Sequence, residues 1–373
     1  MMSQLRSAAV LTLTLALTCA GCGHVIQGEF APNHPGKTYD FAGRKCDRQR
    51  PGGAGPDEVF IRYLGAGGLY LEWRGTPVLF GPFFSNPSFP RALLGRLAAN
   101  QVRIEGGLKG MDLGGVKAIF VGHAHYDHLA DVPFIVESFS PDAKVYVNQT
   151  GANMLAKVNS VQGKVRVLEH EPKAEVGLIR VRAVKSKHAP LFWGIHWARG
   201  EVGDPWKKDW TRRRFRQLKG GTTFAFVIDL LDDLGAVRYR IYYQDSASPE
   251  GEGVPAFEDA FEPGYDLAVL CMASFKYVKN HPGGILDKLR PRHVLVTHYE
   301  NFSRDSLDPD KPLQFVTLLT NRGANKFLGT VRASLSAEPS TGPVDAVCGP
   351  SSPVSTMPLP GEWLRFRAAR GKP

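Results

Sequence analysis

A short segment in the first half of the chain concentrates four side chains that can bind metal ions. His123, His125, Asp127 and His128 follow the apolar run 116–121. Imidazole and carboxylate groups are ligands that borderline cations such as zinc accept. In extended backbone His123 and His125 point to one side, because side chains alternate with a period of two. If a helix follows, Asp127 and His128 project toward a second point. One loop could then supply two metal ions; the alternative is a solvated surface loop.

The spacing His-x-His-x-Asp-His after a strand resembles the signature of the metallo-β-lactamase superfamily. The resemblance covers about residues 58–335 of this sequence. It implies an α/β fold, an αββα sandwich of two mixed β-sheets with helices on the outer faces. It also implies two divalent metal ions, whose further ligands stand singly at the ends of later strands.

Three single residues stand where the resemblance implies such ligands. Each directly follows a strand-like run: His188 after 178–187, Asp245 after 240–244 and His298 after 293–297. The competing histidines are His196, His281 and His293. Of these, His196 lies between apolar neighbours and could equally be a packed core residue, and His293 begins its strand rather than ending it.

The family pattern divides the ligands between two metals. One metal takes His123, His125 and His188, the other takes Asp127, His128 and His298, and Asp245 bridges them. Zinc is the expected metal, with manganese or iron as alternatives. Asp127 is also the expected catalytic residue, which orients the nucleophile or moves its proton. Lys276 and Tyr299 are candidates for contacts to substrate, with a surface role as the alternative for each.

The sequence departs from the family pattern at one position. The strand 77–80 is usually followed by Asp-Pro, and the aspartate supports the ligand loop from behind. Here the residues are Gly81 and Pro82. Loss of such a supporting carboxylate weakens metal binding by about 10–100-fold, unless another residue takes over the support.

The elements that must position these residues are short and rich in β-branched and aromatic side chains. Such runs predict strands near 59–64, 69–73, 77–80, 116–121, 144–147, 164–168, 178–184, 223–230, 237–243, 266–272 and 293–297. Helices are predicted near 131–139, 152–158 and 284–289. This series predicts two sheets with helices packed outside. Gly65 to Gly68 is expected to form a hairpin turn, because no helix follows it as a dinucleotide-binding loop would require.

The N-terminus has the pattern of an export signal. Arg6 precedes the uncharged run 8–18, which is too short to span ~30 Å of hydrocarbon as a helix. Cys22 follows small residues, as in a bacterial lipoprotein cleavage box, and Gly23 in place of an acid points to the outer membrane. We therefore expect a lipid anchor on Cys22 and a bacterial envelope location facing the periplasm; a buried core helix is the alternative. The expected organisation is a signal peptide at 1–21, a lipidated N-terminus and flexible tether at 22–57, a hydrolase domain at 58–335 and a C-terminal tail at 336–373.

Composition adds a charge bias and a weak cysteine signal. The chain has 46 lysines and arginines against 36 acids, a net charge of +10, which favours anionic partners. The segment 204–220 mixes seven cations with Trp206, Trp210 and Phe215, which suits lipid headgroups or single-stranded nucleic acid, while a solvated amphipathic helix is the alternative. Cys46 and Cys348 could pair in an exported compartment, and Cys271 is expected to be a buried free thiol.

Together these features predict a metal-dependent hydrolase. Two close cations make hydroxide available near neutral pH for attack on an electrophilic carbon or phosphorus. The loop motif, with Gly65 to Gly68 before the second strand, most resembles the branch that includes the N-acyl phosphatidylethanolamine phospholipase D type and the ascorbate-phosphate lactonase type. A phosphodiester, with a phospholipid as one candidate, is the expected substrate, and nucleic acid is not. The alternatives are a lactone or cyclic-ester hydrolase with the same metals, and a non-catalytic envelope-binding protein that keeps the fold.

Overall fold

The computed structural model describes residues 50–52, 55–190, 198–208, 210–256, 264–304, 313–316, 318–335, 342–344 and 351–368. The predicted signal peptide, Cys22, the Cys46–Cys348 pair and His196 lie outside these residues. Within the described part of the chain, no helix combines the length and the apolar character that a bilayer span needs.

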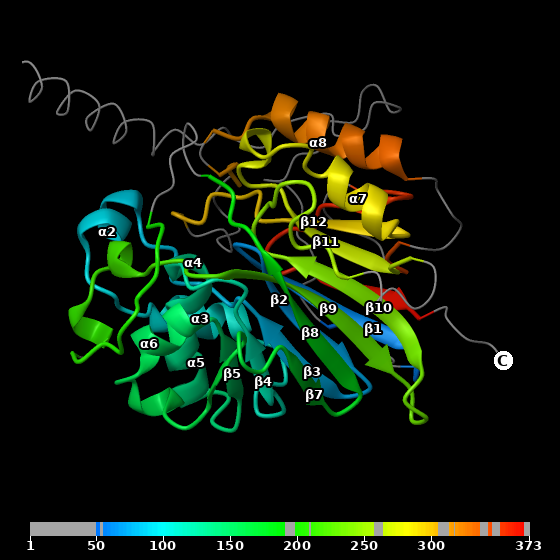
Figure 1. The fold of residues 1–373 in the computed structure, drawn as a ribbon. Helices are drawn as coiled ribbons and strands as arrows, with labels where there is room; N and C mark the ends of the chain where they lie inside the picture. The colour runs from blue at the N-terminus through cyan, green and yellow to red at the C-terminus, as the bar shows by residue number, and fades with distance from the viewer. Residues whose placement is uncertain are drawn as a thin grey trace, which may run out of the picture.

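Two mixed β-sheets form the centre of the molecule, as the αββα prediction required (Figure 1). The seven-stranded sheet has the order β15 (Trp363–Arg367), β1 (Glu58–Gly65), β2 (Gly68–Trp73), β3 (Thr76–Phe80), β4 (Ala118–Phe120), β5 (Lys144–Val147), β6 (Val165–Val167). The eight-stranded sheet has the order β13 (Ser351–Ser352), β14 (Ser355–Thr356), β12 (His293–Thr297), β11 (Leu267–Cys271), β10 (Val237–Gln244), β9 (Thr223–Leu231), β8 (Ile179–Ser186), β7 (Lys173–Val176). The first sheet is antiparallel from β15 to β3 and parallel from β3 to β6. The second is parallel from β14 to β10 and antiparallel at both ends.

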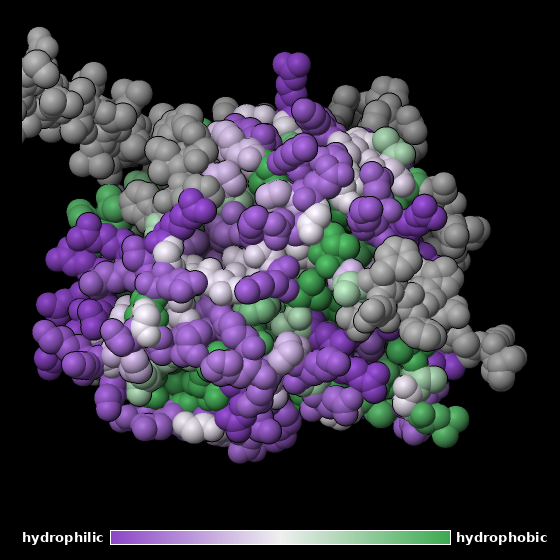
Figure 2. All heavy atoms as spheres, viewed as in Figure 1, coloured by the Kyte–Doolittle hydropathy of each residue, from purple (hydrophilic) through white to green (hydrophobic). Residues whose placement is uncertain are grey.

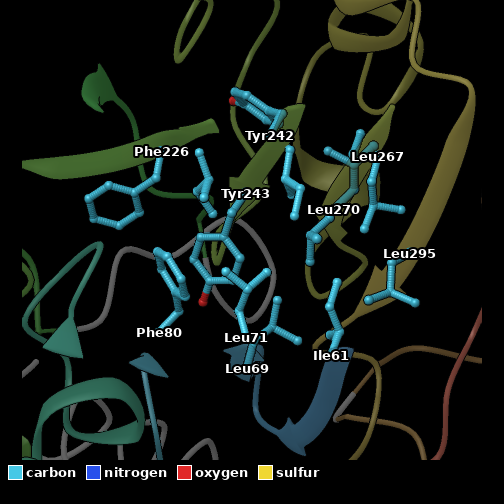
Figure 3. Packing of buried hydrophobic residues seen from close by; sticks show 14 of the residues in the cluster. Ile61, Leu69, Leu71, Phe80, Phe226, Tyr242, Tyr243, Leu267, Leu270 and Leu295 are labelled. Carbon is cyan, nitrogen blue, oxygen red and sulfur yellow. The ribbon is translucent and has the colours of Figure 1, made fainter. Parts of the chain in front are cut away.

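Period-two alternation builds a core on both faces of the first sheet. On β1, Val59, Ile61 and Tyr63 belong to the cluster between the sheets, whereas Phe60 and Leu64 belong to the cluster under the helices. Figure 3 shows residues of both sheets meeting in the inner layer, among them Phe80 and Phe226, whose ring centroids are 5.8 Å apart. The layers on both faces of β1 are apolar, so its apolar residues do not alternate with exposed polar ones.

Helices cover the outer sides of the sheets (Figure 1). They are α2 (Phe89–Leu94), α3 (Gln101–Leu108), α4 (Tyr126–Leu129), α5 (Val132–Ser138), α6 (Gln149–Leu155), α7 (Gly283–Leu289) and α8 (Asn321–Ser334). The sequence prediction missed α8, although Ala324, Phe327, Leu328 and Val331 have helical spacing and are buried. Gly323 and Gly329 lower its intrinsic helix propensity, so packing of this apolar face stabilises it.

The C-terminal residues complete both sheets. Strand β15 pairs antiparallel with β1, and β14 pairs parallel with β12. These strands lie beyond residue 335, where the sequence pattern placed the end of the domain. The second sheet therefore depends on a segment that the sequence suggested to be a tail.

His293 is a buried packing residue at the start of β12. Its Nδ1 lies 3.3 Å from the Pro353 carbonyl oxygen, and its Nε2 lies 2.9 Å from Thr356 Oγ1. A neutral ring satisfies both contacts by donating from Nδ1 and accepting at Nε2. Burial lowers the pKa of His293 to about 4, below the usual 6.5.

Acidification should therefore destabilise the protein partly through His293. Between about pH 6.5 and pH 4 the unfolded chain binds a proton at this ring that the folded chain does not, so the free energy of unfolding falls by up to about 3 kcal/mol as the pH drops. Urea unfolding should show that His293→Gln has a lower free energy of unfolding than the unsubstituted chain at pH 8. Between about pH 6.5 and pH 4, the free energy of unfolding of the variant should change less steeply with pH. A slope equal to that of the unsubstituted chain would contradict this.

Candidate metal centre

Four strand ends meet at one edge of the sandwich. Strands β8, β10 and β12 run in the same direction, so their carboxyl ends share one edge of the second sheet. Asp245 and His298 come immediately after the ends of β10 and β12, and His188 comes two residues after the end of β8. The loop after β4 reaches the same place from the first sheet and enters α4, which begins at Tyr126.

The structure brings all seven predicted ligands together. Their ligand atoms form three groups, each within 4.8 Å: His123 with His125 and His188, His123 with His128 and Asp245, and Asp127 with His128 and His298. The first and last groups are the two sets that the family pattern predicted. Asp245 lies beside the first set, with Oδ1 3.1 Å from His123 Nδ1, and beside the last, with Oδ2 3.7 Å from His128 Nδ1.

Unpartnered buried atoms show that this donor set fits metal ions. His123 Nε2, both ring nitrogens of His128, His298 Nδ1 and Asp245 Oδ2 have no hydrogen-bond partner among the described residues. Buried polar atoms without partners are rare, and each calls for an explanation such as an ion. Imidazole nitrogens and carboxylate oxygens in threes are the ligand set that zinc accepts.

Burial keeps the imidazoles in the form that binds metal. Desolvation lowers the pKa of His125 to about 3 and that of His128 to about 4, and it holds the pKa of His123 and His188 well below 6.5. Burial alone would raise the pKa of Asp127, but the surrounding histidines outweigh it and lower this pKa. His123, His125, His128 and His188 are therefore neutral near neutral pH and Asp127 is ionised, which is the state that a cation requires. The pKa of His298 is raised instead, because its contact with Asp127 outweighs burial, and burial raises the pKa of Asp245.

Glu300 supports His298 and was not predicted from the sequence. The His298 amide donates to Tyr63 Oη (2.8 Å), and this hydroxyl donates to Glu300 Oε2 (2.6 Å). Glu300 also accepts a hydrogen bond from the Ala66 amide. The contacts hold His298 in a left-handed conformation with φ of 54°, which is uncommon for a residue with a side chain. The only sequence signal for this role was that Glu300 stands two residues after His298. A carboxylate at that position could equally be exposed on the surface, so the sequence does not identify the support.

The glycine turn between β1 and β2 forms part of the floor of the site. The turn was predicted as a hairpin connection, which is confirmed. Gly67 has a φ of +81°, and a Cβ there would lie 3.4 Å from His298 Cδ2 and 3.6 Å from His128 Cε1. Tyr243 Oη fixes the turn by donating to the Gly67 carbonyl oxygen (2.9 Å). A Cβ at these distances would make ordinary van der Waals contact, so the positive φ is what favours glycine here.

Gly81 also lies against His128. Its φ is +45°, and a Cβ would lie 3.1 Å from His128 Nδ1. The segment after it is held by a different carboxylate, because Asp131 accepts hydrogen bonds from the Phe84 and Ser85 amides (2.7 and 2.8 Å). The departure from the family pattern therefore gives close backbone packing against a ligand, while Asp131 secures the neighbouring loop.

A largely apolar cavity opens above the seven residues. Phe89, Leu93, Phe215 and Phe275 contribute to its walls, and Arg216 and Lys276 add positive charge. Lys276 thus lies where a substrate contact was expected, with its ammonium 3.1 Å from the Leu318 carbonyl oxygen. Tyr299 does not: it is fully buried and donates to the Pro358 carbonyl oxygen (2.6 Å). Because Tyr299 follows His298, its side chain points away from the site, and the expected contact was wrong.

Two further expectations change with the structure. Trp206, Trp210 and Phe215 are buried in the cluster under the first sheet, so they do not form an exposed aromatic surface. The segment carries 3₁₀ turns at Trp210–Arg212 and Phe215–Gln217 rather than an amphipathic helix.

Cys271 is a buried free thiol, as predicted. His281 and His293 are buried away from the seven residues and contact carbonyl oxygens.

Two mixed sheets with outer helices and a His/Asp cluster at the strand ends form an αββα sandwich with a candidate metal centre, as the resemblance to the metallo-β-lactamase superfamily implied. Residues 76–231 match the family model described as the beta-lactamase superfamily domain. The chain is 31% identical over 97 residues to a UPF0173 metal-dependent hydrolase of Aeropyrum pernix, a match that covers 26% of this chain. It spans about a third of that relative's length (33%).

Solved structures of similar fold include two hydrolases. Igni18, described as a novel metallo hydrolase from Ignicoccus hospitalis, has a TM-score of 0.48 and 15% identity, over 83% of this chain and 99% of that chain. An isothiocyanate hydrolase from Delia radicum gut bacteria has a TM-score of 0.46 and 15% identity, over 83% of this chain and 100% of that chain.

A methyl group at Gly81 should weaken metal binding, and Gly75 offers a matched control. Both residues have positive φ, so either change to alanine should cost about 1–2 kcal/mol of stability. A Cβ at Gly75 would meet nothing within 4 Å, whereas one at Gly81 would press on His128. Zinc titration should therefore show weaker binding for Gly81→Ala than for Gly75→Ala. Equal affinities in the two variants would contradict the packing role of Gly81.

Removing the charge of Glu300 should loosen the metal held through His298. Glu300→Gln and Tyr63→Phe are each expected to lower the affinity for that metal about 10–100-fold. Neither change should release the metal held by His123, His125 and His188. Metal titration followed by element analysis would show one ion retained. Glu72→Gln is the control, because Glu72 is a hydrogen-bonded carboxylate whose contacts are with Arg50 and Tyr70. Loss of both ions together would count against a specific role.

Proposed function

We propose that the protein is a dinuclear metal-dependent hydrolase that cleaves phosphodiesters. The observation that carries the proposal is the convergence of seven histidines and aspartates from four strand ends, six of them buried and His188 half-buried, with five of the seven lining a cavity. Zinc is the proposed metal at both positions, on the chemistry of the ligands. Anchoring through Cys22 in the outer membrane is proposed on the N-terminal pattern alone.

The chain's own residues divide the work at the site. Two divalent cations, when bound, would acidify water and polarise the bond under attack. Asp127 is the proton acceptor of this proposal: it lines the cavity, and its Oδ2 lies 3.5 Å from His298 Nε2 and 3.6 Å from His128 Nε2. Asp127 therefore lies against both imidazoles, with its carboxylate at the cavity. Asp245 spans both ligand sets and keeps them at a fixed separation.

The cavity walls support an anionic substrate with an apolar part. Arg216 and Lys276 would attract and orient a phosphodiester, which keeps a negative charge, and the aromatic walls would accept its organic substituents. Lys187, which flanks His188, is a weaker candidate because its ammonium is paired with Glu252 at 2.5 Å. The bias toward phosphate thus rests on Arg216 and Lys276.

A lactone or other cyclic ester is the second candidate substrate. The largely apolar lining favours it, since a neutral ring would need no cationic partner. Under this alternative, Arg216 and Lys276 would have little effect on turnover, which separates the two substrates experimentally.

Turnover should depend on the metals and on His123. His123→Ala, or removal of metal by a chelator, should reduce hydrolysis of bis(p-nitrophenyl) phosphate by about 100-fold or more, because the charge stabilisation at the reacting bond is lost. His170→Ala is the control, since His170 is exposed. The same preparations would be assayed on a panel of lactones and analysed for metal content. Full activity in the metal-free chain, or a single class of activity restricted to lactones, would overturn the phosphodiesterase proposal.

A further inference from the structure

Two segments far apart in the sequence lie side by side at the cavity. The turn after α2 meets the segment 205–217: the Leu97 amide donates to the Arg213 carbonyl oxygen (2.8 Å), and Arg96 and Arg214 form an isolated β-bridge. We call the described residues of 87–98, 205–208 and 210–219 the cationic rim. In Figure 1 the rim lies at the left of the molecule, around α2.

The cationic rim accounts for most of the excess positive charge of the chain. Residues 87–98 and 205–219 contain nine lysines and arginines against one acid, Asp209, which lies outside the described residues. The net charge of these two ranges is therefore +8, in a chain of net charge +10. Figure 2 shows strongly hydrophilic residues gathered over this side. Five of the rim arginines are exposed and form no ion pair within the described chain: Arg91, Arg96, Arg212, Arg214 and Arg216.

The aromatic residues of the rim face inward, which argues against single-stranded nucleic acid. Proteins that bind such strands stack bases on exposed aromatic rings. Trp206, Trp210 and Phe215 are instead buried, and Arg213 covers the Trp206 ring at 4.4 Å from its centroid. The exposed surface of the rim is therefore cationic and aliphatic rather than aromatic.

Helix α2 connects the rim to the cavity through its apolar side chains. Phe89 and Leu93 line the cavity, while the next residue, Leu94, is 59% exposed between Arg91 and Arg96. A lipid surface offers both partners for this arrangement, because anionic headgroups attract the cations and the layer beneath them accepts an aliphatic side chain.

We propose that the cationic rim docks on an anionic lipid surface, with Leu94 inserted among the headgroups and the cavity mouth turned toward the lipid. This contact is made by the folded domain and is separate from the predicted anchor at Cys22. Docking would place the metal centre next to lipid molecules in the surface. The proposed substrates are therefore phosphate esters that are themselves lipids. That last step rests on the proposed function; the docking does not.

Vesicle binding tests the proposal without any turnover. Full-length chains that carry Cys22→Ser would be sedimented with phosphatidylcholine vesicles with and without phosphatidylglycerol, over a range of salt concentrations. We expect tighter binding to the anionic vesicles and weaker binding as salt rises. Arg91→Gln, Arg212→Gln and Arg214→Gln together should weaken it about 100-fold. Leu94→Ser should weaken it about 10-fold, with little change in the salt dependence.

A matched triple variant controls for net charge. Lys288→Gln, Arg322→Gln and Lys326→Gln remove three exposed cations from α7 and α8, away from the rim, and should leave binding to anionic vesicles close to that of the Cys22→Ser chain. Equal losses in both triple variants would show a net-charge effect and overturn the proposal. Tighter binding of a single-stranded oligonucleotide through the same rim arginines would overturn it in favour of nucleic acid. Failure of docking with intact metal-dependent hydrolysis would leave the proposed function standing.

Discussion

Burial of polar atoms that have no protein partner is the constraint on which the rest of this structure depends. His123, His128, His298 and Asp245 contribute such atoms at the edge of the sandwich. An unpaired polar group costs free energy in a low-dielectric interior, whereas a bound cation turns the same atoms into ligands. Metal binding and folding are then coupled, because the ligand geometry exists only when both sheets are assembled.

The sandwich positions these ligands with close backbone packing and with the buried carboxylates of Glu300 and Asp131. The backbone turns at Gly67 and Gly81 pack against the imidazoles of His128 and His298. Glu300 fixes the strained backbone at His298 through Tyr63. Strain at a ligand persists only where its surroundings determine it, and here two sheets and a buried carboxylate do so.

Helix α2 and the segment 205–217 relate the metal centre to the surface. The same short elements supply apolar cavity walls on one side and exposed cations on the other. Buried Trp206 and Trp210 attach this basic segment to the core, so its charges are held in place although its backbone is largely irregular. Under the two proposals, substrate selection and surface attraction would share one structural unit, and both would act on anions.

The sequence by itself indicated the strands that carry the site and the seven residues near their ends. Four of these residues form one motif after the run 116–121, and His188, Asp245 and His298 each follow a β-rich run. It could not show that Tyr299 points into the core, that Glu300 supports His298, or that the residues of β15 belong to the first sheet. Helix α8 was missed because its stability comes from packing rather than from propensity. Only the tertiary structure decided these points, since each depends on contacts between segments that are distant in the chain. The same holds for the cationic rim, because its basic residues form one patch only when folding brings α2 next to the segment that contains Arg213 and Arg214.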